Sequence, residues 1–424
     1  MSLRCRYLHS LLLGISFACY GLAAYMVGPS RVDLAQRLAS DYAHVSLGQT
    51  ARGVGCCAGS LLSSLVWQRL PRQPPLAACL SLLAILMLAI PHSRFLPVYL
   101  ACELAFGVAA ALIDVGINCW TLELWGREAN PVMQALYLCN SIGITAAPLL
   151  VRPFLSPDGV DARRMGEEGG RETRIAVAYA IAALLLTTAA GMQAAMYCVC
   201  RYDASAAAAA ASHPPLEEDK SSKKSEGSSQ VRVILVTTTA CLLLSTFCGC
   251  EITMINFFPQ FAVSIGLGIR KGSAALMTSL LTATFAASRL ATIAVAVKVS
   301  PTGMLAASFA ILATGGALLR AFAPSSEAVL WISAALIGVG CSSVNPSLLS
   351  LLQRDAGVRV ETRVCAALML SSYVVSLVVP LFLAPAIDAR PILFVDVSLA
   401  LVAASVAALA LLLLLIRCSS RCAK

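Results

Sequence analysis

The 424-residue chain is too apolar for an ordinary water-soluble protein. Hydrophobic residues make up 58% of it and charged residues only 12%, about half the charged fraction of a typical soluble domain. The formal net charge of +9 does not indicate a nucleic-acid partner, because the basic residues fall mainly between the apolar segments. This composition predicts an all-α integral membrane protein whose surroundings are the lipid bilayer.

Twelve apolar runs are long enough to cross a membrane. A hydrocarbon core about 30 Å thick requires about 20 apolar residues in a helix. The first run is long and no clear cleavage site follows it, so we interpret it as a retained span rather than a signal peptide. We predict one transmembrane helix in each of the runs 8–29, 46–67, 75–91, 95–119, 131–155, 175–199, 231–259, 273–297, 302–322, 327–352, 362–386 and 391–416.

Residues 201–230 interrupt this series, with six runs before them and six after. They contain a polyalanine stretch, two adjacent prolines and a segment rich in lysine and serine, a composition typical of a flexible linker. We predict an N-terminal six-helix bundle (1–200), a cytosolic linker (201–230) and a C-terminal six-helix bundle (231–424). Placing both termini in the cytosol puts most of the basic connecting residues inside, and we expect a multi-pass plasma-membrane protein.

Several landmarks recur at an interval of about 230 residues, which indicates an internal repeat. Pro148 in the fifth run matches Pro380 in the eleventh, and Asn118 in the fourth run matches Asn345 in the tenth. Twelve helices in two parallel six-helix pseudo-repeats, with a substrate site near the midplane, constitute the major facilitator architecture. We therefore predict that fold.

Charged side chains inside the runs mark candidate functional positions, since each costs about 3 kcal/mol in the bilayer centre on insertion scales. Glu103, Asp114 and Asn118 share one stripe of a helix with Gly107. Burial raises the pKa of a carboxylate and a nearby cation lowers it, so a midplane aspartate can alternate between charged and neutral forms. We predict ion coupling by Asp114, Asn118 and Glu103, including a possible sodium site near Asp114. A purely structural role is the alternative, in which Asp114 accepts a hydrogen bond from Asn118 or bonds to a neighbouring helix.

The fifth run offers uncharged hydrogen-bonding groups at helical spacing. Gln134, Tyr137 and Ser141 recur along it, and Asn140 lies on a neighbouring face. Donors, acceptors and an aromatic ring together suit a polyhydroxylated small molecule. We predict that these four residues bind substrate, while polar contacts between helices explain them almost equally well.

The second half supplies further candidates around a proline in the seventh run. Pro259 lacks a backbone donor and loosens that helix, close to Glu251 and Asn256. We predict that these two residues and Asn345 complete the substrate site. Arg289 is the candidate for a gate or for a salt bridge to Glu251. No spacing of Cys or His residues predicts a metal site, so we expect no cofactor beyond the coupling ion.

The segment 107–154 resembles a known family. It contains Asp-x-Gly-x-Asn at 114–118, Leu-Trp-Gly at 124–126 and Pro-x-Met-Gln-Ala-Leu at 131–136. These elements resemble the sodium-dependent glucose transporter group of the major facilitator superfamily, which includes major facilitator superfamily domain-containing protein 4. The resemblance implies hexose transport by alternating access. The more distant fucose/proton symporters have an acid four residues before the Asn, thought to carry the coupling proton, and that role would fall on Asp114.

The leading hypothesis is a secondary transporter that moves a hexose or related polyol as a monomer. A carrier of a lipid, drug or organic anion is the first alternative, and a non-transporting scaffold or receptor is the second. An enzyme is not expected, because no cluster at a membrane interface pairs a nucleophile with a base. The sequence departs from the superfamily in the short segment 67–72 after the second run, and from closer relatives in having Tyr137 where His is expected.

Overall fold

The computed structural model describes residues 3–38, 42–155, 174–202, 223–269, 271–355, 361–387 and 390–422. Its helices group into two compact units, which we describe separately. Unit 1 contains Met1–Ile117 and Leu136–Asp203, and unit 2 contains Asn118–Ala135 and Ala204–Lys424. The block Asn118–Ala135 thus groups with the second unit, although the two helices that carry it also have residues in the first.

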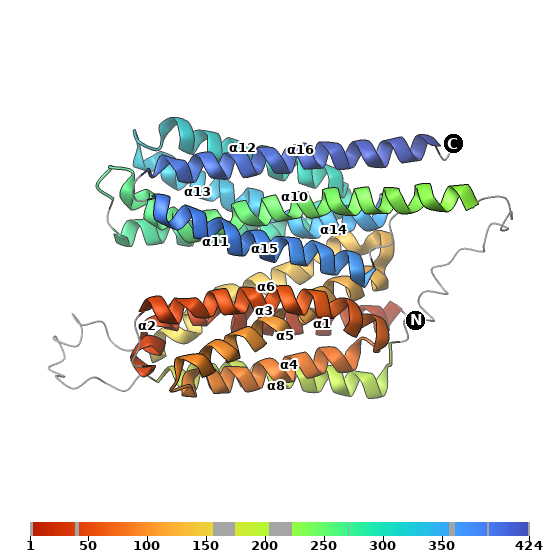
Figure 1. Cartoon of the computed structure of the whole chain (residues 1–424), viewed down its shortest axis with the longest axis horizontal. Coiled ribbons are helices and arrows are strands. Elements are labelled where there is room, and N and C mark those ends of the chain that lie inside the picture. Colours follow the sequence, from red (N-terminus) through yellow and green to blue (C-terminus); the bar gives the residue numbers. More distant parts are fainter. Residues whose placement is uncertain are drawn as a thin grey trace. The chain divides into compact units, whose positions relative to one another are not determined.

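Unit 1 is built from long helices that pack side by side. Helix α4 packs along α8, and α8 also packs against α1 (Figure 1). The apolar side chains of Leu13, Leu76, Leu80 and Tyr179 are fully buried in this unit. Its helices are α1 (Leu3–Tyr25), α2 (Val27–Arg37), α3 (Tyr42–Arg69), α4 (Gln73–Ala89), most of α5 (Leu96–Trp125) and of α6 (Ala129–Val151), and α8 (Ile175–Val199).

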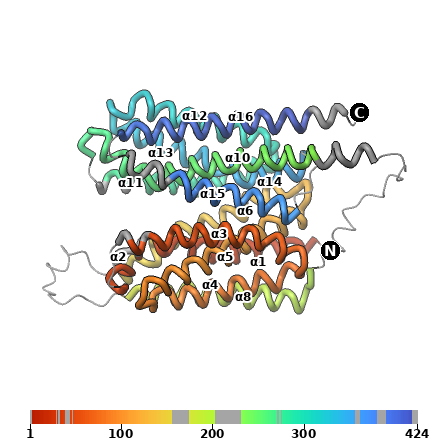
Figure 2. The backbone as a smooth tube through the Cα atoms, in the orientation of Figure 1, coloured from red at the N-terminus to blue at the C-terminus, as the bar shows by residue number. Residues whose placement is uncertain are grey.

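Unit 2 has a similar all-helical build. Helix α10 packs along α15 and α16 (Figure 2), while α13 packs against α11 and α12. The contact between α10 and α16 is stabilised by three buried rings, those of Phe258, Phe261 and Phe394. The centroids of Phe261 and Phe394 lie 4.8 Å apart. The helices are α10 (Lys223–Ser264), α11 (Lys271–Lys298), α12 (Pro301–Phe322), α13 (Glu327–Cys341), α14 (Val344–Arg354), α15 (Thr362–Ile387) and α16 (Ile392–Cys422).

Each of the twelve predicted runs falls on described helices. Ten helical stretches in the described part of the chain are long and apolar enough to cross a membrane, and one of them, Leu96–Phe154, contains two predicted runs. The run 46–67 coincides with α3. Large apolar side chains such as Leu61, Ile85 and Leu184 are more than 60% exposed, as expected for a surface that faces lipid. The all-α membrane fold is confirmed.

At the first run and at the linker, the element boundaries differ from the prediction. The first run is two helices, because α1 ends at Tyr25 and α2 begins at Val27, with Pro29 in the first turn of α2, where a missing N–H breaks no hydrogen bond. Helix α10 begins at Lys223, inside the predicted linker. Once a helix nucleus has formed, each further residue adds one hydrogen bond. The helix of the apolar run therefore extends back into the polar residues that precede the run. Residues 203–222 lie outside the described ranges.

Candidate functional site

The acidic stripe of α5 faces the interior of unit 1. Glu103 is 1% exposed, and Asp114 is partly buried. Asp114 lies within electrostatic reach of Tyr20 on α1 and Cys56 on α3. Asn118, one turn further along α5, is 1% exposed. Both Asp114 and Asn118 are engaged with other groups. Asp114 therefore lies near α1 and α3.

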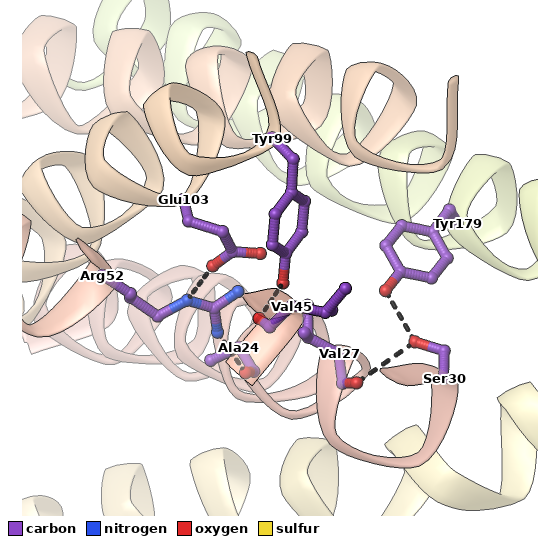
Figure 3. Close-up of polar contacts among 8 residues, drawn as sticks. All are labelled: Ala24, Val27, Ser30, Val45, Arg52, Tyr99, Glu103 and Tyr179. Atoms are coloured by element: carbon purple, nitrogen blue, oxygen red, sulfur yellow. Dashed lines mark hydrogen bonds and ion pairs between the residues drawn. The ribbon is translucent and has the colours of Figure 1, made fainter. Parts of the chain in front are cut away.

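Glu103 forms a buried ion pair with Arg52 of α3. Arg52 Nε donates to Glu103 Oε2 at 2.7 Å, and Nη1 donates to the carbonyl oxygen of Ala24 at 2.6 Å (Figure 3). The guanidinium also lies 4.1 Å from the ring centroid of Phe106. Arg52 Nη2 and Glu103 Oε1 have no hydrogen-bond partner among the described residues. One arginine therefore ties α1, α3 and α5 together through a pair that is costly to break.

Arg52 is absent from the predicted site residues, although it lies inside the predicted run 46–67. A charged residue within an apolar run was the signal that could have found it. Its partner Glu103 is 51 positions away in sequence. The packing of α3 against α5, which no local pattern reveals, brings the two together.

Glycines set the distance between α3 and α5. A methyl group on Gly107 would overlap the carbonyl oxygen of Arg52, and one on Gly55 would overlap the carbonyl oxygen of Leu104. The two backbones are therefore in direct contact, which small residues permit in membrane helices. This contact places the Arg52 side chain beside Glu103.

Two tyrosines fix the helices around the ion pair. The hydroxyl groups of Tyr179 and Ser30 lie 2.7 Å apart, and Tyr99 Oη donates to the carbonyl oxygen of Val45 at 3.4 Å (Figure 3). Both rings are fully buried. These bonds join α8 to α2 and α5 to α3. The helices that surround Arg52 and Glu103 are therefore also linked by hydrogen bonds outside the ion pair.

Gln134 lies in unit 2, fully buried, with both ends of its amide hydrogen-bonded. Its Nε2 donates to Ser347 Oγ of α14 at 3.1 Å, and its Oε1 accepts from Thr292 Oγ1 of α11 at 3.2 Å. Nearby, Asn130 Nδ2 contacts Met304 Sδ of α12 at 3.4 Å. These contacts fasten the start of α6 to three helices of unit 2. The Gln134 amide is thus engaged with protein groups in this structure.

The other predicted substrate residues of α6 lie in unit 1, where Tyr137 and Asn140 contact α1. The ring of Tyr137 meets the ring of Phe17 edge-on at 5.5 Å between centroids. Asn140 Nδ2 donates to the Phe17 carbonyl oxygen at 3.1 Å, and Ser141 Oγ donates to the Tyr137 carbonyl oxygen at 2.9 Å. Asn140 thus makes a polar contact between helices, which was the alternative to substrate binding. A role in binding stays a prediction for all three.

The candidates of the second half are spread along α10 and α14. Glu251 is partly buried within electrostatic reach of Arg289, whereas Asn256 is exposed. Asn345 is partly buried, and its Oδ1 accepts a weak hydrogen bond from Cys248 Sγ at 3.8 Å. Glu251 and Asn345 therefore have neighbours in the interior of unit 2, whereas Asn256 is solvent- or lipid-accessible.

Arg289 occupies a break between two helices. The predicted run 327–352 is divided into α13 and α14 around Ser342. Pro346 lacks the N–H that would bond to the Ser342 carbonyl four residues earlier, and Arg289 Nε donates to that oxygen at 3.1 Å. The guanidinium lies 4.1 Å from the ring centroid of Phe285, and the residue is 3% exposed. Arg289 thus satisfies a carbonyl that the proline leaves open.

The described residues contain no group of three or more His, Cys, Asp or Glu side chains placed to hold a metal ion. The chemistry available is hydrogen bonding and charge pairing on membrane helices. A family model for the Major Facilitator Superfamily matches residues 13–380. The chain belongs to this superfamily. It is a multi-pass membrane protein of a family of transporters.

Among curated proteins, this major facilitator is similar over part of its length to sodium-dependent glucose transporters. Sodium-dependent glucose transporter 1 of Danio rerio is 30% identical over 147 residues, which are 35% of this chain and 25% of the relative. Sodium-dependent glucose transporter 1A of Mus musculus is 26% identical over 137 residues, 32% of each protein. The chain thus matches a third or less of the length of these relatives.

Solved structures are similar over nearly the whole chain. The major facilitator FucP in its outward conformation has a TM-score of 0.68 at 16% identity, covering 97% of this chain and 99% of FucP. The proton:xylose symporter XylE, bound to 6-bromo-6-deoxy-D-glucose, has a TM-score of 0.71 at 13% identity, with coverages of 96% and 95%. At these identities the likeness shows the major facilitator fold.

Proposed function

We propose that the chain is a secondary transporter that moves a hexose or related polyol by alternating access, coupled to sodium or protons through Asp114. The observation that carries this proposal is a partly buried acidic side chain in the middle of α5 that lies near α1 and α3 inside unit 1. Ionisable groups at such depth mark ion or substrate pathways. The local similarity to sodium-dependent glucose transporters supports a sugar as cargo.

Glu103 and Asp114 of α5 have different parts in this mechanism. Glu103 is held by Arg52 at 2.7 Å, and a cation approaching it would meet the positive guanidinium. Asp114 lies 11 positions further along the same helix, with Asn118 one turn beyond it. We assign ion binding to Asp114 with help from Asn118, and assign to Glu103 the role of fixing α5 against α3.

Substrate binding is assigned to the polar side chains of α6, α10 and α14. Gln134 donates and accepts through one amide, as a sugar hydroxyl requires of its partners. In alternating access the helices change neighbours, so the hydrogen bonds seen here would be exchanged for bonds to substrate. We assign to Arg289 the gate, because it joins α11 to the α13–α14 break. The other proposed substrate residues are Tyr137, Asn140, Ser141, Glu251, Asn256 and Asn345.

Transport by the purified full chain in proteoliposomes tests this function. Uptake of labelled D-glucose, L-fucose and D-xylose is measured with an inward sodium gradient, with choline replacing sodium, and with an inward proton gradient. We expect accumulation above equilibrium under one gradient, competition by unlabelled hexoses, and loss of accumulation when an ionophore collapses that gradient.

Three outcomes would overturn the proposal or part of it. Absence of sugar uptake and of sugar counterflow under every condition would remove hexoses as the cargo. Saturable sugar binding without any flux would instead indicate a receptor. Sugar flux that only equilibrates under both gradients would retain the cargo and remove the coupling role of Asp114.

A further inference from the structure

The segment that follows α8 is held in place at one end of unit 1. Gln73, fully buried at the start of α4, donates through Nε2 to the Cys200 carbonyl oxygen at 3.1 Å and accepts at Oε1 from the Tyr202 N–H at 3.0 Å. The buried ring of Tyr202 meets the ring of His9 edge-on, with 6.2 Å between centroids. One glutamine and one ring contact therefore fix the backbone on both sides of Arg201.

This arrangement brings two cysteines into contact. The Sγ atoms of Cys200 and Cys5, near the start of α1, are 3.1 Å apart. A disulfide bond is about 2 Å long, so a shift of about 1 Å would join them. Both residues are partly exposed, which leaves them open to a small oxidant. The two positions are 195 residues apart in sequence, and the Gln73 contacts keep them adjacent.

We propose that Cys5 and Cys200 form a reversible oxidation site, which takes a hydroperoxide or glutathione disulfide as its oxidant. With hydrogen peroxide, one thiolate attacks an oxygen atom and becomes a sulfenic acid, releasing one water after protonation. The second thiol attacks that sulfur and expels a second water. Each sulfur loses one electron, the peroxide gains two, and the two thiol protons end in water. A thiol reductant reverses the reaction.

The bond would join the start of α1 to the segment that leads out of α8. Both cysteines belong to unit 1. The disulfide closes a long loop of the chain and restricts the unfolded state. If the termini are cytosolic, as predicted, glutathione keeps the pair reduced under ordinary conditions. Oxidation of the pair is then a response to oxidant exposure. Its expected consequence is a higher resistance of unit 1 to heat.

The test uses the full chain in native membranes. Membranes are treated with hydrogen peroxide or with glutathione disulfide, free thiols are blocked with N-ethylmaleimide, and digested peptides are identified by mass spectrometry. We expect a Cys5–Cys200 linked peptide after either oxidant and its loss after dithiothreitol. The midpoint of heat-induced aggregation should rise by several degrees in the oxidised protein and return on reduction.

Matched variants separate this pair from general cysteine oxidation. Cys5→Ser and Cys200→Ser should each abolish the linked peptide and the thermal shift. Cys198→Ser is the control, because Cys198 is exposed two residues before Cys200, and it should change neither. The proposal is overturned if the wild-type chain yields no Cys5–Cys200 peptide under either oxidant, or if the thermal shift persists in Cys5→Ser. The mass-spectrometric result on the wild-type chain decides the matter even if a variant fails to fold.

Discussion

Helix α5 and the helix pair α13–α14 occupy corresponding places in the predicted repeat, marked by Asn118 and Asn345, yet they differ in what they carry. Helix α5 is continuous from Leu96 to Trp125 and has an acid, Asp114, in its middle. Its counterpart is divided after Cys341, the residue that matches Asp114. At this place in the repeat, one region thus carries a carboxylate side chain, and the other carries a backbone carbonyl that accepts from an arginine.

A buried arginine accompanies each region, and its partner reflects that difference. Arg52 pairs with the Glu103 carboxylate, whereas Arg289 donates to the Ser342 carbonyl. Both guanidinium groups lie 4.1 Å from the centroid of a phenylalanine ring, a favourable cation–π distance. Arginine thus serves a directly paired carboxylate in unit 1. In unit 2 it serves a peptide dipole, with the Glu251 carboxylate also within electrostatic reach. A full charge tolerates the loss of its partner less well.

The largest effect is expected at Asp114, which has Cys341 rather than an acid as its counterpart in α13. Asp114→Asn should abolish gradient-driven accumulation of sugar and retain counterflow, because an amide cannot bind and release a proton or carry the charge that attracts a cation. Proteoliposome uptake measures both. Asp396→Asn is the control, since Asp396 is a largely exposed acid at the start of α16. Accumulation equal to wild type in Asp114→Asn would remove this residue from coupling.

The next effect concerns the ion pair of unit 1. Arg52→Met and Glu103→Gln should each lower the free energy of unfolding by about 3–5 kcal/mol, because each leaves a buried charge without its partner. The double variant should lose less than the sum of the two. Denaturant unfolding in mixed micelles measures these values. Strictly additive losses would show that the two side chains do not stabilise each other.

A smaller effect is expected at the broken helix of unit 2. Arg289→Met removes the donor to the Ser342 carbonyl, and an unsatisfied buried carbonyl costs about 1–3 kcal/mol. Pro346→Ala restores a backbone N–H at the position four residues after Ser342, so Arg289→Met should cost less in that background. The same unfolding measurement checks it. An equal loss in the proline and alanine backgrounds would contradict the idea that the proline creates the need for Arg289.

The smallest effect is expected at the exposed ion pair. Arg320 Nε and Asp396 Oδ1 are 2.6 Å apart, with 53% and 45% of the two side chains exposed. Arg320→Ala should change the free energy of unfolding by about 1 kcal/mol or less, because solvent screens the pair. Raising the salt concentration should shrink the difference further. A loss as large as that of Arg52→Met would show that burial is not what separates the two pairs.

The helices could be predicted from sequence because each apolar run is a local signal. Runs of about 20 residues coincide with the described helices, and the repeat of proline and asparagine landmarks indicates the major facilitator fold that the family match shows. The stripe of Glu103, Asp114 and Asn118 also follows from helical spacing alone. Periodicity therefore predicts which face of α5 carries polar groups.

The partners of these groups could not be predicted in the same way. The bond from Gln134 to Ser347 joins positions 213 apart, and Arg52 reaches Glu103 only because two helix backbones touch at Gly55 and Gly107. Such contacts depend on which helices become neighbours. The break at Ser342 could be expected from Pro346, which is close to it in sequence. Arg289, which donates to the Ser342 carbonyl, lies 53 positions away.

The contact at Gly55 and Gly107 changes how natural variants of this chain should be ranked. Substitution scales treat glycine to alanine as among the mildest of replacements. At these two positions the added methyl group would overlap a carbonyl oxygen of the facing helix. Exchanges among leucine, isoleucine and valine at exposed positions such as Leu61 or Ile85 would alter only the lipid-facing surface. In this protein the chemically mildest variant can therefore be the more damaging one.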